Sequence, residues 1–188
     1  MGTKRKATTR RKPNKKIKSN STYVISIDVG VVNFAYTILK DAKVLTCQNR
    51  KVCNFRGSKD YVQMCETVFG FFEEHVPRSS WGETELVIER QMKTSIMRIF
   101  AVSLEVAWFH ITGKRAHVIS PILVKRYFGT SKGKYKANKH AAIQLMPTIC
   151  QRYPSVRKTW LNVCTKNMKI DDLADSIIQS IYFIENDN

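Results

Sequence analysis

Three short apolar segments follow one another near the start of the chain, separated only by short turns. Residues 23–28, 33–39 and 43–49 are rich in β-branched and aromatic side chains and have the length of strands. Residues 30–33 and 40–43, which lie between them, have the composition of turns. The sequence therefore predicts three consecutive strands, so any fold of this chain must contain a sheet.

Helix-like and strand-like segments alternate along the rest of the chain. Helices are predicted over residues 59–75, 94–112, 122–128 and 138–146 and from about residue 171, and strands over 85–89 and 116–120. In the first helix, four apolar side chains recur at helical spacing: Val62, Cys65, Phe69 and Phe72. This order predicts an α/β fold, in which a mixed sheet is flanked by helices. We assign no pattern to residues 147–168.

The predicted helix 94–112 is apolar over most of its circumference. Such a helix has few positions suited to solvent, so it is buried in the core, in a subunit interface, or in both. We take it as the candidate dimer element. The alternative is simple packing within the core of one chain.

Positive charge dominates the composition. The chain has 32 Lys and Arg against 15 Asp and Glu, a net charge of +17, and residues 1–20 hold nine basic residues and no acid. We predict that residues 1–20 form a disordered basic tail, and that residues 21–188 form one folded domain. Because the folded part is basic as well, a nucleic acid is the expected partner. The tail itself is a DNA-binding arm, a nuclear address or a solubilising arm.

Cysteine usage and hydropathy indicate the compartment in which the protein is expected. The five cysteines, Cys47, Cys53, Cys65, Cys150 and Cys164, are an odd number without a C-x-x-C pair, which favours a reducing compartment and no zinc cluster. No apolar run reaches the roughly 18 residues of a membrane span, so we expect no membrane partner.

Four acidic residues occupy positions where a carboxylate needs a partner. Asp28 and Glu89 each end an apolar strand. If those strands are neighbours, both carboxylates emerge at the edge of the sheet where open α/β folds bind ligands. Asp172 and Asp175 share one face of the last helix, which could dock against the same strand ends.

Each acid also has a structural interpretation. The Asp28 side chain could cap its own turn. Glu89 could pair with Arg90 or extend to solvent. The acids at the start of the last helix could cap it and complement its dipole, and Asp171 is the natural N-cap.

Considered together, clustered acids point to a metal site. Two unit charges 4 Å apart repel by about 4 kcal/mol at an effective dielectric near 20, so four close carboxylates must take up protons or bind a cation. Ligands that are all oxygen favour Mg²⁺, with Mn²⁺ as a substitute, over Zn²⁺. On a strongly basic chain, the expected substrate of such a site is a phosphodiester, which two divalent ions can hydrolyse by in-line displacement.

Four segments, taken in order, resemble a known family. They are SIDVGVVNFAYTIL, LVIERQ, VISPILVKRYFG with ANKHAA, and DDLADSIIQSI, and together they cover about residues 23–184. The chain resembles the RuvC-like Holliday junction resolvases, most closely those of poxviruses and other large DNA viruses. This resemblance implies a ribonuclease H-like fold, a homodimer, two divalent ions per active site, and paired nicks in opposing strands of a four-way junction.

The resemblance also implies roles for individual residues. Four carboxylates look like the metal ligands: Asp28, Glu89, Asp172 and Asp175. Lys125 and Lys139 match positions where these resolvases often carry lysines near the scissile phosphate, although a solvated helix position is the alternative for Lys125. Gln91 matches a place close to DNA. We expect the lysines of the segment 125–139 to hold DNA phosphates: Lys125, Lys132, Lys134, Lys136 and Lys139.

The expected function is structure-selective, Mg²⁺-dependent cleavage of branched DNA that leaves 5′-phosphate and 3′-hydroxyl ends. Two alternatives remain open, namely a nuclease for RNA–DNA hybrids or flaps on the same fold, and a non-catalytic basic binding module. The expected location is intracellular and reducing, such as a viral replication site or the host nucleus or cytoplasm.

Overall fold

The structure is a computed structural model that describes residues 22–30, 33–52, 61–91, 96–131, 135–164 and 169–186. The predicted basic tail, residues 1–20, lies outside the described residues. In chain order the elements are β1 (Tyr23–Asp28), β2 (Asn33–Lys40), β3 (Lys43–Lys51), α1 (Tyr61–Glu73), the 3-10 helix η1 (Arg78–Glu83), β4 (Glu85–Glu89), α2 (Ile96–Thr112), β5 (His117–Ile119), α3 (Pro121–Tyr127), α4 (Tyr135–Arg152), α5 (Pro154–Cys164) and α6 (Ile170–Asn186).

The five strands form one mixed sheet in the order β3-β2-β1-β4-β5. The three predicted strands at the start pair in antiparallel fashion, and the turn between β2 and β3 is tight because Asp41 and Ala42 both have positive φ, 51° and 61°. β4 pairs in parallel with β1 on one side and with β5 on the other. The predicted α/β class, a mixed sheet flanked by helices, is confirmed.

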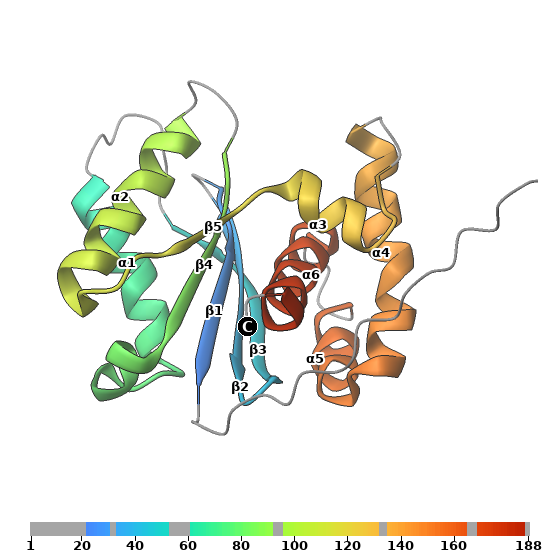
Figure 1. Cartoon of the computed structure of the whole chain (residues 1–188), viewed down its shortest axis with the longest axis horizontal. Coiled ribbons are helices and arrows are strands. Elements are labelled where there is room, and N and C mark those ends of the chain that lie inside the picture. Colours follow the sequence, from blue (N-terminus) through green and yellow to red (C-terminus); the bar gives the residue numbers. More distant parts are fainter. Residues whose placement is uncertain are drawn as a thin grey trace, which may run out of the picture.

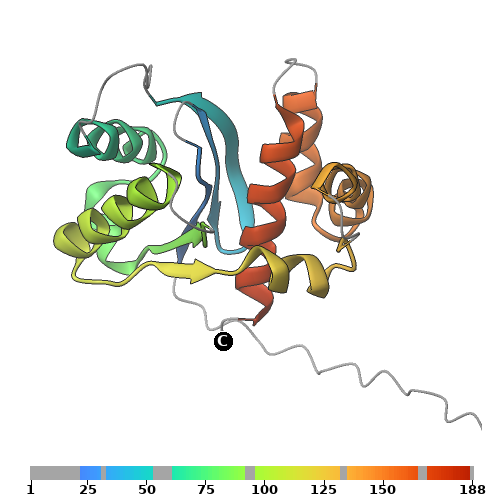
Figure 2. The ribbon, with the colours of Figure 1, turned by 90° about the horizontal axis from the view of Figure 1, so that it is seen from above.

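Helices cover both faces of the sheet (Figures 1 and 2). On one face, α1 and α2 pack over the side chains of Ile25, Ile27 and Ile88. On the other face, α6 lies directly on the sheet beside Val24 and Val87, α4 packs against α6, and α5 packs against β3 and α4. Neighbouring residues of a strand point to opposite faces. Within one strand, alternate residues therefore enter the same core, as Ile25 and Ile27 of β1 do.

α6 is buried around most of its circumference, with Leu173, Ala174, Ile177 and Ile181 at 1% exposure or less. The sequence predicts an amphipathic helix here, but the structure places this helix between the sheet and α4. Asp171, expected as the N-cap, lies inside the first turn, because the helix already begins at Ile170.

The end of α4 and all of α5 lie in residues 147–164, part of the stretch to which we assigned no pattern. α4 continues through Pro147, whose ring is exposed, so the missing backbone N–H forfeits a hydrogen bond without a clash in the core. Buried side chains on either side of the proline, Met146 and Ile149, pack into the same core as α6. The burial of these two side chains stabilises the helix by more than the hydrogen bond lost at Pro147 costs.

α1 matches its prediction except at one residue. Cys65, Phe69 and Phe72 are buried, whereas Val62 is 68% exposed. The helical period was right, but Val62 lies outside the arc that faces the sheet.

α2 is apolar on two opposite faces. Phe100, Leu104 and Trp108 are fully buried against the sheet. The opposite face exposes four large apolar side chains, Ile99, Val102, Val106 and Phe109, each between 48% and 62% exposed. Core packing therefore explains only half of the apolar character that the sequence shows.

The described cysteines are free thiols: Cys47, Cys65 and Cys150 are buried and Cys164 is exposed. Within the described ranges, no helix combines the length and the apolar composition that a membrane crossing requires.

Candidate active site

Asp28 and Glu89 end adjacent parallel strands at the same edge of the sheet. Ile27 of β1 is in register with Ile88 of β4, and each acid is the next residue along its strand. The side chains of Ile27 and Ile88 enter the core under α1 and α2. By alternation, both carboxylates project from the opposite face, the one that α6 covers.

This edge lies where the strand order reverses. From β1 the chain continues to β2 on one side, whereas β4 is followed in the sheet by β5 on the other side. Such a switch point opens a crevice outside the carboxyl ends of the strands, which is where open α/β sheets bind their ligands.

A buried side chain of α6 fixes the helix over this edge. The Gln179 amide nitrogen donates to the carbonyl oxygen of Ile27 at 3.2 Å and to that of Val87 at 3.5 Å. Asp175 lies one turn before Gln179 on the same side of the helix. The third predicted carboxylate is thereby held close to the ends of β1 and β4.

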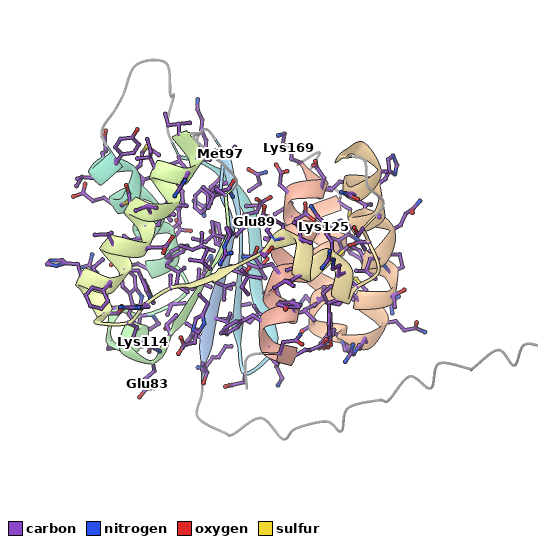
Figure 3. All side chains as sticks on the ribbon, turned by 45° about the horizontal axis from the view of Figure 1, so that its top comes forward. Glu83, Glu89, Met97, Lys114, Lys125 and Lys169 are labelled. Carbon is purple, nitrogen blue, oxygen red and sulfur yellow. The ribbon has the colours of Figure 1, made fainter. Side chains whose placement is uncertain are left out.

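A small cavity brings three of the predicted residues together. Its lining includes Glu89 from β4, Asp175 from α6 and Lys125 from α3, together with Thr130 and Gln179. Figure 3 shows Glu89 and Lys125 close to each other. The structure thus joins two carboxylates and one ammonium group from three separate elements.

Asp172 lies one turn further toward the start of α6. Its Oδ2 is 3.5 Å from the Nζ of Lys169, and its side chain is 21% exposed. Of the residues described, neither Asp172 nor Asp28 lines the cavity that Glu89 and Asp175 share. Asp28 ends the strand that pairs with the strand of Glu89, and Asp172 is three residues before Asp175 on α6.

The roles of all the predicted residues remain predictions, and the rest of them lie outside this cavity or outside the described residues. The Gln91 side chain turns back toward β4, where its Nε2 donates to the Glu89 carbonyl oxygen at 3.4 Å. Lys136 and Lys139 are in the first turns of α4, but their side chains are outside the described set. Lys132 and Lys134 lie outside the described residues altogether.

A small polar network supports α6 next to Asp175. The Ser176 hydroxyl is 2.8 Å from the Thr37 hydroxyl of β2, and the Thr37 hydroxyl donates to the Cys47 sulfur at 3.4 Å. Burial raises the pKa of the Cys47 thiol to about 11. The thiol is therefore neutral at physiological pH and adds no negative charge beneath the carboxylates.

Comparison with known proteins identifies the family. Residues 22–186 match the family described as Poxvirus A22 protein. The chain belongs to this family. The resemblance to the RuvC-like resolvases of poxviruses, which the sequence motifs carry, is confirmed. No curated protein matches the chain in sequence.

Two solved structures have the same fold as this member of the poxvirus A22 family. The structure of Thermus thermophilus RuvC in complex with a Holliday junction substrate has a TM-score of 0.54 at 10% identity, covering 86% of this chain and 92% of the RuvC chain. A second Thermus thermophilus RuvC structure has a TM-score of 0.51 at 11% identity, covering 86% and 95%. The ribonuclease H-like fold is thus confirmed.

The donor set at this edge of the A22-family chain suits a hard divalent cation. Asp28, Glu89 and Asp175 offer carboxylate oxygens from three directions, which Mg²⁺ and Mn²⁺ prefer over nitrogen or sulfur ligands. Within the described ranges, however, no three acidic, His or Cys side chains stand close enough together to form a ready-made ligand group. The backbone brings these acids to one edge, and their side chains are not closed around one point.

Two residues that line this cavity in the A22-family chain were missed in the sequence. Thr130 is 6% exposed and donates its backbone N–H to the Lys125 carbonyl oxygen at 2.8 Å, which ends α3. No sequence pattern marks it. Gln179 is 3% exposed and follows Asp175 by one turn, but Ser176 and Ser180 are polar and buried in the same stretch, so the sequence does not single out Gln179.

Proposed function

We propose that this chain is a Mg²⁺-dependent endonuclease that resolves four-way DNA junctions by paired nicks, leaving 5′-phosphate and 3′-hydroxyl ends. The observation that carries the proposal is the in-register placement of Asp28 and Glu89 at one edge of the sheet, with Asp175 of α6 on the same cavity as Glu89. Membership of the poxvirus A22 family and the fold shared with a RuvC in complex with a Holliday junction substrate support it.

The carboxylates would hold the cations. Asp28 of the central strand β1, Glu89 of β4 and Asp175 of α6 would hold them. Asp172, one turn before Asp175, would add a fourth carboxylate. When bound, the ions supply Lewis acidity for in-line displacement at phosphorus. The protein contributes rigid placement: each acid sits on a strand or helix rather than on a loop.

Lys125 would hold the DNA phosphate that is cut. Lys125 lines the same cavity as Glu89 and Asp175, so its positive charge would offset part of the negative charge of the carboxylates. A phosphodiester brings further negative charge to the same place. More negative charge develops on its oxygens in the transition state. A fixed cation there stabilises the transition state more than the ground state.

We further propose that two copies associate through the exposed face of α2. Ile99, Val102, Val106 and Phe109 follow one another at intervals of three, four and three residues, the spacing of a helix–helix seam. A second copy presents the same seam, so a two-fold pair can bury both at once. Such a pair would present two active sites to the two opposing strands of a junction.

A panel of labelled substrates tests the function. The full chain is incubated with Mg²⁺ and a four-way junction, a linear duplex, a flap or an RNA–DNA hybrid of matched sequence. Symmetric nicks confined to the junction are the expected result. Faster cleavage of the hybrid or the flap would show that the junction is not the substrate. Binding of the junction without cleavage would show that the chain is not a nuclease.

A further inference from the structure

Gln179 is a buried polar residue in the helix that carries Asp175. Its side chain is 3% exposed, and its amide nitrogen donates to the backbone carbonyls of Ile27 in β1 and Val87 in β4. One amide therefore joins α6 to both of the parallel strands that end in acids. A buried amide in such a position fixes the distance between the elements it joins, because moving them apart would leave polar groups without partners.

The two acceptor carbonyls lie next to the candidate metal ligands. Ile27 directly precedes Asp28, and Val87 is two residues before Glu89. Asp175 is one turn before Gln179. The backbone segments that carry all three carboxylates are thus held by one side chain that is not itself charged.

Other buried polar residues of α6 make different contacts. The Ser180 hydroxyl donates to the Ile177 carbonyl oxygen at 2.7 Å within the same helix. The Ser176 hydroxyl lies against Thr37 of β2, a strand that carries none of the four acids. Of these three residues, only Gln179 bonds to the strands that end in Asp28 and Glu89. Ser180 is a buried polar neighbour without such a bond in the residues described, which suits it as a control.

We propose that Gln179 is a positioning residue of the metal site, which sets the spacing of Asp28, Glu89 and Asp175 through the carbonyls of Ile27 and Val87. This inference rests on the proposed function, since it assumes that these acids bind the catalytic ions. Residues that orient metal ligands without touching the metal typically change metal affinity or activity by about 10- to 100-fold when replaced. We expect an effect of that size on affinity.

The test compares Gln179→Met, which keeps the length of the side chain and removes its donor, with the control Ser180→Ala. Mn²⁺ binding to each metal-free full-length variant is titrated by electron paramagnetic resonance. Gln179→Met should weaken binding at least tenfold, and Ser180→Ala should bind within about twofold of the wild type. Because an unfolded fraction would raise the apparent dissociation constant, a thermal melt first establishes that each variant is folded at the temperature of the titration.

A second measurement requires no metal. Amide hydrogen exchange of segments 22–30 and 170–186 should be faster in Gln179→Met than in Ser180→Ala, since the amide holds these segments together. Wild-type Mn²⁺ affinity in Gln179→Met would overturn the inference and leave the proposed function standing. If the wild type itself neither binds Mn²⁺ nor cuts junctions, the proposed function fails and this role for Gln179 fails with it.

Discussion

Asp28 and Glu89 end two hydrogen-bonded parallel strands, each one residue beyond the register pair of Ile27 and Ile88. Both side chains face α6, whose Gln179 bonds to backbone carbonyls of both strands. Carboxylates placed like this repel one another unless a cation or a proton lies between them. Catalysis and metal binding should therefore depend on these side chains.

Replacing Asp28 with Asn should abolish junction cleavage and leave junction binding intact. The amide keeps the size of the side chain but removes a negative ligand. Because the change also relieves repulsion between carboxylates, the melting temperature of the metal-free protein should fall by less than about 5 °C. Gel-shift binding, a cleavage assay and a thermal melt check the three parts. Lost binding together with a larger drop in melting temperature would mean that Asp28 serves the fold instead.

Replacing Lys125 with Ala should lower the cleavage rate roughly 100-fold, the size of effect seen when one group that stabilises a transition state is removed. The control is Arg126→Ala, which removes the same charge from the adjacent, exposed position of α3. Single-turnover rates on the junction at saturating protein separate chemistry from binding. If both variants lose the same factor, Lys125 acts only through the general positive charge of the surface.

The sequence predicted the sheet better than the helices that cover it. β1 and β4 were recognisable because each is a short apolar run that ends in one acid, a pattern typical of a buried strand. α4 was cut short at Pro147, since the packing of Met146 and Ile149 against the core is a tertiary effect that no local pattern records. Val62 kept the helical period and yet lies outside the buried arc.

At the candidate site, the acids and Lys125 were predictable from the sequence, but the contacts that hold them in place were not. The pairing of β1 with β4 is a long-range contact, so the convergence of Asp28 and Glu89 was a hypothesis until the register was known. Thr130 and Gln179 act through backbone carbonyls, and hydrogen bonds to the backbone leave little trace in the sequence.

Replacing Val106 with Glu should prevent dimer formation. Val106 is 62% exposed in the middle of the apolar seam on α2, and the change would bury two like charges in a two-fold interface. The matched control is Val62→Glu, where the valine is 68% exposed and belongs to a different helix, α1. Sedimentation at micromolar concentration should show a dimer for the wild type and for Val62→Glu, and a monomer for Val106→Glu. A wild type that sediments as a monomer contradicts the proposed interface.

Acid stability should depend on Glu85, which begins β4. Burial raises the pKa of its carboxyl, but hydrogen bonds from His117 and Lys114 outweigh burial and hold that pKa below its usual value. The stabilisation is therefore complete above the pKa of the unfolded chain, roughly 4.3, and is lost as the pH falls through the lower pKa of the folded state. Glu85→Gln should be less stable than the wild type at pH 7, with the gap closing toward pH 3. Denaturant melts across this range check it, and a gap that stays constant with pH would assign the effect to lost packing.

Mn²⁺ binding to the metal-free chain is the most direct measurement of a shared metal site. Asp28→Asn, Glu89→Gln and Asp175→Asn are compared with Glu83→Gln, which removes an exposed carboxylate just before β4, at the opposite end of that strand from Glu89 (Figure 3). If the three acids bind the same ions, each of the first three variants weakens Mn²⁺ binding at least tenfold, and Glu83→Gln binds like the wild type. Equal binding in all four variants would contradict a site built from these acids.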